Sequence, residues 1–256
     1  MLSKEKLLNV FTDEDIIDAT KIYEKYKLAY EKDITVFSNG FYPPNIWSYF
    51  EKNLNSNIFL VESNGLFQEA ERRMISFNNN YGMDFPIDII KVMNKSNFSN
   101  LKHKDFLGGI LSLGIERNKI GDIVVKDNTA YLPVINDISN YILSNLSYIG
   151  KSPVEVTILN TLDEMPQVDF EEMVINVSSL RIDSIVAKLC NLSRSKAIEE
   201  LDSGKVLIDY VKAKDKSQEI IKGSRLTIRG SGKYLVGDIV GETRSGKQKV
   251  RIKKYI

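Results

Sequence analysis

Four consecutive residues in the last third of the chain, Ser193-Arg194-Ser195-Lys196, are of types that bind phosphate readily. Arginine can hold a phosphate through two parallel hydrogen bonds, lysine acts as a point charge, and serine adds a hydroxyl donor. Ser193 is a good N-cap, so the group is expected in the first turn of a helix. Backbone N–H groups there carry a partial positive charge that attracts anions. The four residues together predict a phosphate-binding turn, whereas Ser193 alone would indicate ordinary capping.

Two short amphipathic helices are expected to position this turn. The first covers residues 180–189, and its apolar side chains share a face because they are spaced i, i+3, i+4 and i+7: Ile182, Ile185, Val186 and Leu189. The second covers residues 194–203 and turns three apolar side chains inward: Ala197, Ile198 and Leu201. Gly204 is suited to end this helix, and a strand is expected to start at Val206.

The charge of the chain is divided unevenly. The net charge is only +1, but residues 179–256 contain 18 Lys and Arg against 9 Asp and Glu, a balance of +9. Residues 1–178 contain 17 Lys and Arg against 25 Asp and Glu, a balance of −8. Such a basic segment on an acidic remainder indicates a polyanion-binding module. The alternative is a solvated surface whose sign arose by chance.

The whole chain is predicted to be an α+β protein in several parts, since a single core rarely exceeds roughly 250 residues. Helical periodicity over residues 3–32 makes the N-terminal region, residues 1–78, mostly helical. Residues 79–160 form a middle domain. The polar segment 161–178 is expected to be a linker, with a short strand at 173–177, and residues 179–256 are the basic domain.

The middle domain shows the element order β-α-β-β-α-β, which is typical of a ferredoxin-like fold. The expected elements are a strand at 87–93, a helix at 103–113, hairpin strands at 122–125 and 129–132, a helix opening at Pro133, and a strand at 153–159. RNA-recognition domains and many enzymes share this topology, so it assigns no function. The central strands offer only Tyr131 for base stacking, which predicts weak stacking or none.

Residues for common catalytic mechanisms are scarce. A Ser-His-Asp or Cys-His mechanism would depend on His103, the single histidine, and one histidine with one cysteine, Cys190, argues against zinc. Neither a GxxxxGK[ST] loop nor GxGxxG occurs, and Gly230-Ser231-Gly232-Lys233 is expected to be a flexible hairpin. The sequence therefore predicts no catalytic residue, no metal site and no cofactor.

Cysteine usage and hydropathy favour a cytoplasmic protein. A single cysteine allows no intrachain disulfide, and no run approaches the roughly 18 apolar residues of a membrane span. The N-terminal residues are amphipathic and do not form an apolar signal core.

The basic domain resembles the S-four RNA-binding domain, also called the αL motif. The resemblance is carried by these strings: Arg181-Ile182-Asp183, Leu192-Ser193-Arg194-Ser195-Lys196-Ala197, Leu201-Asp202-Ser203-Gly204-Lys205-Val206 and Ile221-Lys222-Gly223-Ser224-Arg225-Leu226-Thr227-Ile228. It implies two helices packed on a small sheet, with the start of the second helix against RNA backbone. Asp209-Tyr210 replaces the usual Asn-Gly turn, and Ser224 replaces the usual Asp.

Nearly the whole chain resembles the bacterial YlmH family, in which Tyr or Trp replaces the turn glycine, as Tyr210 does here. The matching strings are Glu69-Ala70-Glu71-Arg72-Arg73, Leu101-Lys102-His103-Lys104-Asp105-Phe106-Leu107-Gly108, Gly114-Ile115-Glu116-Arg117 and Ile120-Gly121-Asp122-Ile123. The resemblance implies association with the large ribosomal subunit and a part in rescuing stalled peptidyl-tRNA.

These observations select two groups of candidate residues. The expected RNA contacts in the basic domain are Arg181, Lys188, Ser193, Arg194, Ser195, Lys196, Lys205, Arg225, Arg229 and Lys233. Candidates for further RNA contact in the first two parts are Arg72, Arg73, His103, Lys104 and Arg117.

The expected function is non-catalytic binding of ribosomal RNA, with tRNA as a further candidate partner, by a chain that is monomeric when free and has no membrane partner. Two alternatives stay open. One is an RNA-modifying enzyme, either a pseudouridine synthase or a methyltransferase. The other is a protein-interaction adaptor, because the acidic first part is poorly suited to RNA.

Overall fold

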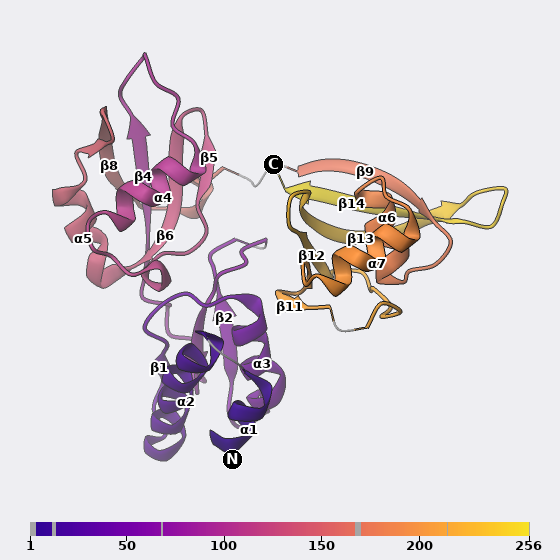
Figure 1. The fold of residues 1–256 in the computed structure, drawn as a ribbon. Coiled ribbons are helices and arrows are strands. Elements are labelled where there is room, and N and C mark those ends of the chain that lie inside the picture. The colour runs from indigo at the N-terminus through magenta and orange to yellow at the C-terminus, as the bar shows by residue number, and fades with distance from the viewer. Residues whose placement is uncertain (1–3, 12–13, 68, 167–169, 214, 256) are drawn as a thin grey trace. The chain divides into compact units, whose positions relative to one another are not determined.

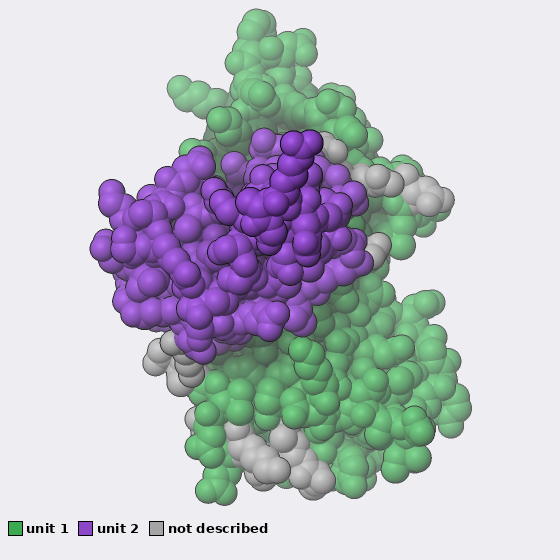
Figure 2. Space-filling model, turned by 90° about the vertical axis from the view of Figure 1, so that its right-hand side faces the viewer, with its two compact units in different colours: residues 1–167 green, residues 168–256 purple. Residues whose placement is uncertain are grey.

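The computed structural model describes residues 4–11, 14–67, 69–166, 170–213 and 215–255 (Figure 1). The chain divides into two compact units, Met1–Gln167 and Val168–Ile256, which Figure 2 colours separately. Each unit is α+β. Across the described residues, no helix combines the length and apolar content that crossing a bilayer requires.

The first part of unit 1 packs three helices beside a small antiparallel sheet. The helices are α1 (Lys4–Val10), α2 (Glu14–Lys32) and α3 (Pro44–Leu54). The sheet has the order β1-β3-β2, with β1 at Val36–Phe37, β3 at Met74–Phe77 and β2 at Val61–Asn64. Aromatic rings fill the space between helices and sheet. The centre of the Tyr26 ring lies 5.7 Å from that of Phe59 and 6.0 Å from that of Phe77. The prediction of a mostly helical region missed most of this sheet.

The second part of unit 1 has one five-stranded antiparallel sheet. Its elements are β4 (Ile87–Asn94), α4 (His103–Leu111), the 3₁₀ turn η1 (Arg117–Lys119), β5 (Val124–Lys126), β6 (Thr129–Ile135), α5 (Asn136–Asn145), β7 (Tyr148–Ile149), β8 (Ser152–Leu159) and the 3₁₀ turn η2 (Leu162–Glu164). The strand order is β5-β6-β4-β8-β7. Alternate residues Ile90 and Val92 of β4 pack with Phe106 of α4 and Ile142 of α5, so both helices cover one face. Lys91 and Tyr131, paired across β4 and β6, lie half-exposed on the other face.

The predicted start of the helix at Pro133 is wrong. Strand β6 continues through Pro133, which pairs with Ile89 of β4, and α5 begins only at Asn136. Leu132 and Val134 on either side are fully buried, so the alternation of a strand persists past the proline. The Pro133 carbonyl accepts from the Gly121 N–H at 2.8 Å, so the polar backbone atoms of this residue face away from β4 and its missing N–H removes no bond of the β4–β6 ladder.

Unit 2 packs two helices against a six-stranded antiparallel sheet. Its elements are β9 (Phe170–Val177), α6 (Ile182–Leu189), α7 (Arg194–Asp202), β10 (Val206–Ile208), β11 (Val211–Lys212), β12 (Arg225–Ile228), β13 (Gly232–Glu242) and β14 (Gln248–Tyr255). The strand order is β11-β10-β12-β13-β14-β9. Helices α6 and α7 lie side by side (Figure 1), and Ile185, Val186 and Ala197 are fully buried in their shared core with the sheet. Leu189 and Ile198, also expected inward, are half-exposed.

Strand β9 corrects the predicted linker at 161–178. All eight residues of β9 pair with β14, so the basic module includes a strand that precedes residue 179. Its acids lie opposite basic residues of β14: Glu172 faces Lys253, with 3.5 Å between carboxylate and ammonium, and Glu171 faces Lys254. Residues 168–256 therefore carry 18 Lys and Arg against 12 Asp and Glu, a balance of +6 in place of +9.

Candidate nucleic-acid interface

The starts of α6 and α7 meet at one buried carboxylate, that of Asp183. Arg181 donates from Nη2 to Asp183 Oδ2 at 3.0 Å and from Nε to Oδ1 at 3.3 Å. Arg194 donates from Nε to the same Oδ2 at 2.9 Å. The Asp183 side chain is 1% exposed, while those of Arg181 and Arg194 are 41% and 54% exposed. The buried acid thus fixes two guanidinium groups that still face solvent.

The two arginines keep the Asp183 carboxylate ionised. Burial alone would raise the pKa of the carboxyl, but hydrogen bonds from Arg181 and Arg194 outweigh burial and hold its pKa below the usual value. One negative charge faces two positive charges, so the cluster keeps a net charge of +1. It can therefore accept a phosphate without losing its internal ion pairs.

The connection between the helices explains why their starts converge. Asn191 adopts a left-handed backbone conformation with φ 53°, which ends α6. The Leu192 N–H donates to the Ala187 carbonyl at 2.8 Å and fixes the turn. Ser193 then caps α7, and its Oγ accepts from the Lys196 N–H at 3.3 Å.

The predicted phosphate-binding turn lies at the start of α7. Ser193, Arg194, Ser195 and Lys196 are all exposed, and the two serine hydroxyls lie 3.0 Å apart. In the first turn of α7 the N–H groups of Arg194 and Ser195 have no partner within the helix, while the N–H of Lys196 donates to Ser193. The structure brings Arg194 together with Arg181, and the residue that joins them, Asp183, was missed as a site residue. The string Arg181-Ile182-Asp183 was the available signal, because it places a carboxylate two residues after an arginine at the start of a helix.

A strained hairpin turn forms a second basic group. Asp209 and Tyr210 join β10 to β11 with φ angles of 46° and 69°, the positive values that a two-residue type I′ turn requires. Asp209 Oδ1 accepts from the Arg225 N–H at 2.9 Å, and Lys233 Nζ lies 5.7 Å from the centre of the Tyr210 ring. Arg225 Nε is buried and makes no hydrogen bond to the residues that the structure describes.

The other predicted cations of unit 2 lie apart from Asp183. Lys188 is in the last turn of α6, roughly 10 Å along the helix from Arg181 at 1.5 Å per residue. The Lys205 ammonium lies 3.0 Å from the Glu200 carboxylate. The backbone carbonyl of Lys205 accepts from the Arg229 N–H at 3.0 Å. Lys188, Lys205 and Arg229 are all exposed.

Two cations of unit 1 that are expected to contact RNA, Arg117 and Arg72, make hydrogen bonds within that unit. Arg117 Nη1 donates to the carbonyls of Ile120 and Gly121, at 2.7 and 3.2 Å. Arg72 Nη2 donates to the Phe41 carbonyl at 2.7 Å. Burial lowers the pKa of Arg117 to about 10 and also lowers that of Arg72. Both guanidinium groups therefore have partners within unit 1, which favours a structural role over the predicted RNA contact.

Arg73 is also occupied, whereas His103 and Lys104 are not buried. Arg73 Nε donates to the Ala70 carbonyl at 3.0 Å, and its guanidinium lies 4.6 Å from the centre of the Trp47 ring. His103 and Lys104 are exposed in the first turn of α4. Of the five further candidates, His103 and Lys104 are the two that are exposed.

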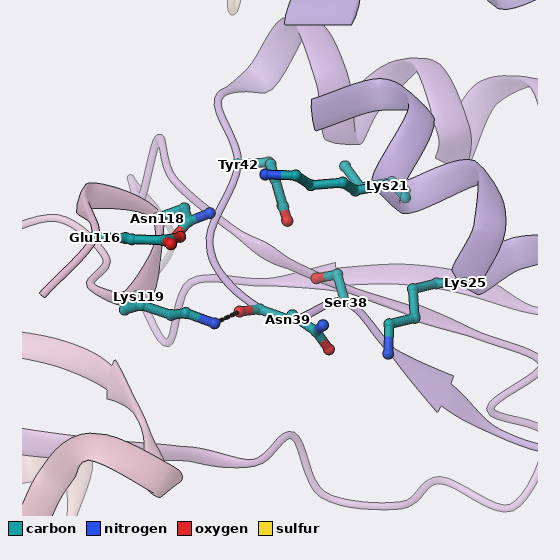
Figure 3. Close-up of a pocket in the computed structure, with 9 residues that line it drawn as sticks. Lys21, Lys25, Ser38, Asn39, Tyr42, Glu116, Asn118 and Lys119 are labelled. Atoms are coloured by element: carbon teal, nitrogen blue, oxygen red, sulfur yellow. Dashed lines mark hydrogen bonds between the residues drawn. The ribbon is translucent and has the colours of Figure 1, made fainter. Parts of the chain in front are cut away.

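Unit 1 also contains a cavity of about 190 Å³ that the sequence did not predict (Figure 3). Lys21 and Lys25 of α2 line it together with Lys119 of η1, whose Nζ donates to the Asn39 carbonyl at 2.9 Å. Burial, reinforced by the charge of Asp18, raises the pKa of Tyr42 to about 12. The Tyr42 hydroxyl therefore stays protonated at neutral pH, and the lining is rich in hydrogen-bond donors.

Comparisons with known proteins agree with one another. The family model described as "Putative RNA-binding domain in YlmH" matches residues 81–163. The Ribosome-associated protein quality control protein P2 of Bacillus subtilis (strain 168) is 30% identical over 172 residues, which cover 67% of each chain.

A solved structure gives a likeness of fold. The Cell division protein ylmH from Streptococcus pneumoniae superposes with a TM-score of 0.50 and 22% identity, covering 61% of this chain and 97% of that one. The family model, the Bacillus relative and this structure point to the same group. The chain belongs to the YlmH-like family.

Proposed function

We propose that this protein binds RNA without catalysis, associates with ribosomal RNA or tRNA on the large ribosomal subunit, and takes part in the rescue of stalled ribosomes in the cytoplasm. The match to a YlmH RNA-binding domain over residues 81–163 supports RNA as the ligand. The printed name of the Bacillus relative supports ribosome-associated quality control as the setting. On this proposal the chain is monomeric when free.

One observation carries the proposal most strongly: Asp183 holds Arg181 and Arg194 beside the first turn of α7. A phosphate there would meet backbone N–H groups, two oriented guanidinium groups and the ammonium of Lys196. A sequence of phosphates along RNA backbone would then continue over Lys205 and Arg229, or over Arg225 and Lys233.

The domain assignments follow the same proposal. We assign residues 79–160 to a ferredoxin-like domain, supported by the order β5-β6-β4-β8 of its antiparallel strands. We assign the basic module to the S-four type, supported by two packed helices on a sheet and by the tyrosine at the β10–β11 turn. Residues 1–78 then form the N-terminal region, and β9 belongs to the S-four module.

The test removes Arg194 and Lys196 in a variant in which residue 183 no longer carries a buried charge. Arg194→Ala alone would leave Asp183 with half its partners, which would be destabilising. We therefore compare Asp183→Asn with Asp183→Asn/Arg194→Ala/Lys196→Ala, which differ only in two cations. Charge-assisted hydrogen bonds contribute about 1.5–3 kcal/mol each, so the triple variant should co-sediment with ribosomes at least tenfold more weakly.

A thermal melt of both variants controls for folding, and equal midpoints are expected. Equal co-sedimentation of the two variants with equal melts would contradict the assignment and shift the contact surface to the Arg225–Lys233 region or to unit 1. Loss of ribosome binding in Asp183→Asn itself would show that the geometry set by the carboxylate matters as much as the cations.

A further inference from the structure

The loop that follows β4 presents an aromatic ring to solvent. Phe98 is fully exposed at this loop, which protrudes beyond the end of β4 (Figure 1). A ring that is held wholly in solvent presents both of its faces to a ligand.

Hydrogen bonds hold the backbone on both sides of Phe98. Asn94 Nδ2 donates to the Ser99 carbonyl at 3.1 Å, and Asn128 Nδ2 donates to the same carbonyl at 3.0 Å. Asn94 Oδ1 accepts from the Ser96 N–H at 2.9 Å, and Ser96 Oγ accepts from the Phe98 N–H at 3.2 Å. The exposed ring is thus carried on an organised loop that is tied to the β5–β6 turn.

The surroundings of the ring are polar and basic. Lys95, Lys102 and Lys104 flank the loop and are all exposed, and residues 95–104 contain no acid. Lys95 is paired with Glu155 of β8 at 2.8 Å. Asp105, the next acid along the chain, is engaged by the Lys102 N–H at 2.8 Å.

We propose that Phe98 stacks on an unpaired RNA base while Lys102 and Lys104 contact the flanking phosphates. This inference deepens the proposed function and rests on it. Single-stranded RNA is bound through aromatic rings that stack on bases and cations that follow the backbone. A protein partner would favour an apolar rim around the ring, whereas Phe98 is set among Asn, Ser and Lys residues.

The experiment uses one RNA hairpin in two forms, with and without a short single-stranded oligoadenylate tail, and the full-length protein. Wild-type protein should bind the tailed hairpin at least fivefold more tightly, because stacking on an aromatic contributes about 1–3 kcal/mol per base. Phe98→Ala should abolish this difference and Phe98→Tyr should keep it. Tyr81→Ala, which removes another highly exposed ring of unit 1, is the matched control and should keep it as well.

A spectroscopic readout separates stacking from an indirect effect. A 2-aminopurine in the tail should lose fluorescence on binding to wild-type, Phe98→Tyr and Tyr81→Ala proteins but not to Phe98→Ala. If wild type binds the hairpin yet gains nothing from the tail, or if Phe98→Ala keeps the gain, the stacking role is overturned while RNA binding stands. If wild type binds neither form, the proposed function and the stacking role both fail.

Discussion

The arginines of the two units differ in what accepts their hydrogen bonds. In unit 1, Arg117 and Arg72 donate to backbone carbonyls and are largely removed from water. In unit 2, Arg181 and Arg194 donate to a buried carboxylate and stay about half-exposed. A guanidinium that is partly buried among carbonyls presents less of itself to a ligand, whereas one that a carboxylate anchors at its edge can still present donors.

This contrast shows that the number of cations in a segment does not locate a nucleic-acid interface. Both groups lie in strings that resemble the same family, and both have the composition of RNA contacts. Only the acceptor and the exposure separate them. Substitutions in each unit test this separation.

Removal of Arg117 should have the largest effect on stability. Arg117→Ala leaves the carbonyls of Ile120 and Gly121 without their donor and should lower the free energy of unfolding by about 2–3 kcal/mol. RNA affinity, measured where the variant is still folded, should not change. Urea unfolding and ribosome co-sedimentation of the same preparation check both statements. A loss of RNA affinity at unchanged stability would return Arg117 to the interface.

Local signals predicted the helices of unit 2 well. Ser193 as N-cap and the apolar spacing after Arg181 placed α6 and α7 close to their observed bounds, because these signals lie within one helix. Residue spacing could not predict that Arg181 and Arg194 converge, since the left-handed Asn191 that folds one helix back on the other has no firm signature in a single sequence.

Long-range pairing explains what could not be predicted. The strand expected at 173–177 was assigned to the linker and predicted too short, because its partner, β14, lies more than 70 residues along the chain. Arg72 and Arg117 looked like exposed cations because their acceptors are carbonyls, which every residue has. The exposure of Phe98 could not be predicted, because a phenylalanine in a loop is as readily buried as exposed and its own sequence neighbours do not decide between the two.

Asp183→Asn should have the next largest effect and should depend on pH. The pKa of Asp183 is below its usual value in the fold, so the carboxylate stabilises the protein above the unfolded pKa of about 3.9. This contribution is lost as pH falls through the lower folded pKa. Asp183→Asn should therefore be about 1–2 kcal/mol less stable at pH 7, with weaker neutral hydrogen bonds to both arginines.

Denaturant unfolding at a series of pH values measures this difference. The gap between wild type and Asp183→Asn should be constant from pH 8 to about pH 5 and should shrink below about pH 4. A gap that keeps its full size well below pH 3 would mean that the carboxylate is not the source of the stabilisation.

Salt dependence should change by a smaller but specific amount. Each phosphate contact contributes roughly 0.7–0.9 to the log–log slope of affinity against salt. Loss of Arg194 and Lys196 should therefore make the slope for a ribosomal RNA fragment about 1.4–1.8 less steep than in Asp183→Asn. Lys216→Ala/Lys222→Ala removes two exposed lysines that pair with Asp202 and Asp238, and it should leave the wild-type slope nearly unchanged. A wild-type slope near zero would contradict an electrostatic interface.

Catalytic turnover on RNA is expected to be zero, and the pKa shifts of two groups, one in each unit, agree with this expectation. General acid–base catalysis works best when a group has a pKa near the operating pH. In unit 1 the pKa of the Tyr42 hydroxyl rises to about 12, and in unit 2 the pKa of Asp183 falls below its usual value. Both shifts move away from neutrality, so each group keeps one protonation state at pH 7.

A fixed protonation state suits a binding site, because hydrogen-bond donors and charges then stay constant while the ligand docks. Incubation of the protein with undermodified ribosomal RNA and S-adenosylmethionine, followed by mass spectrometry of nucleosides, tests the expectation. New pseudouridine or methyl marks in molar excess over protein would show that the protein is an enzyme. In that case His103, exposed at the start of α4, would be the first residue to replace, since Tyr42 and Asp183 are poorly poised to exchange protons at pH 7.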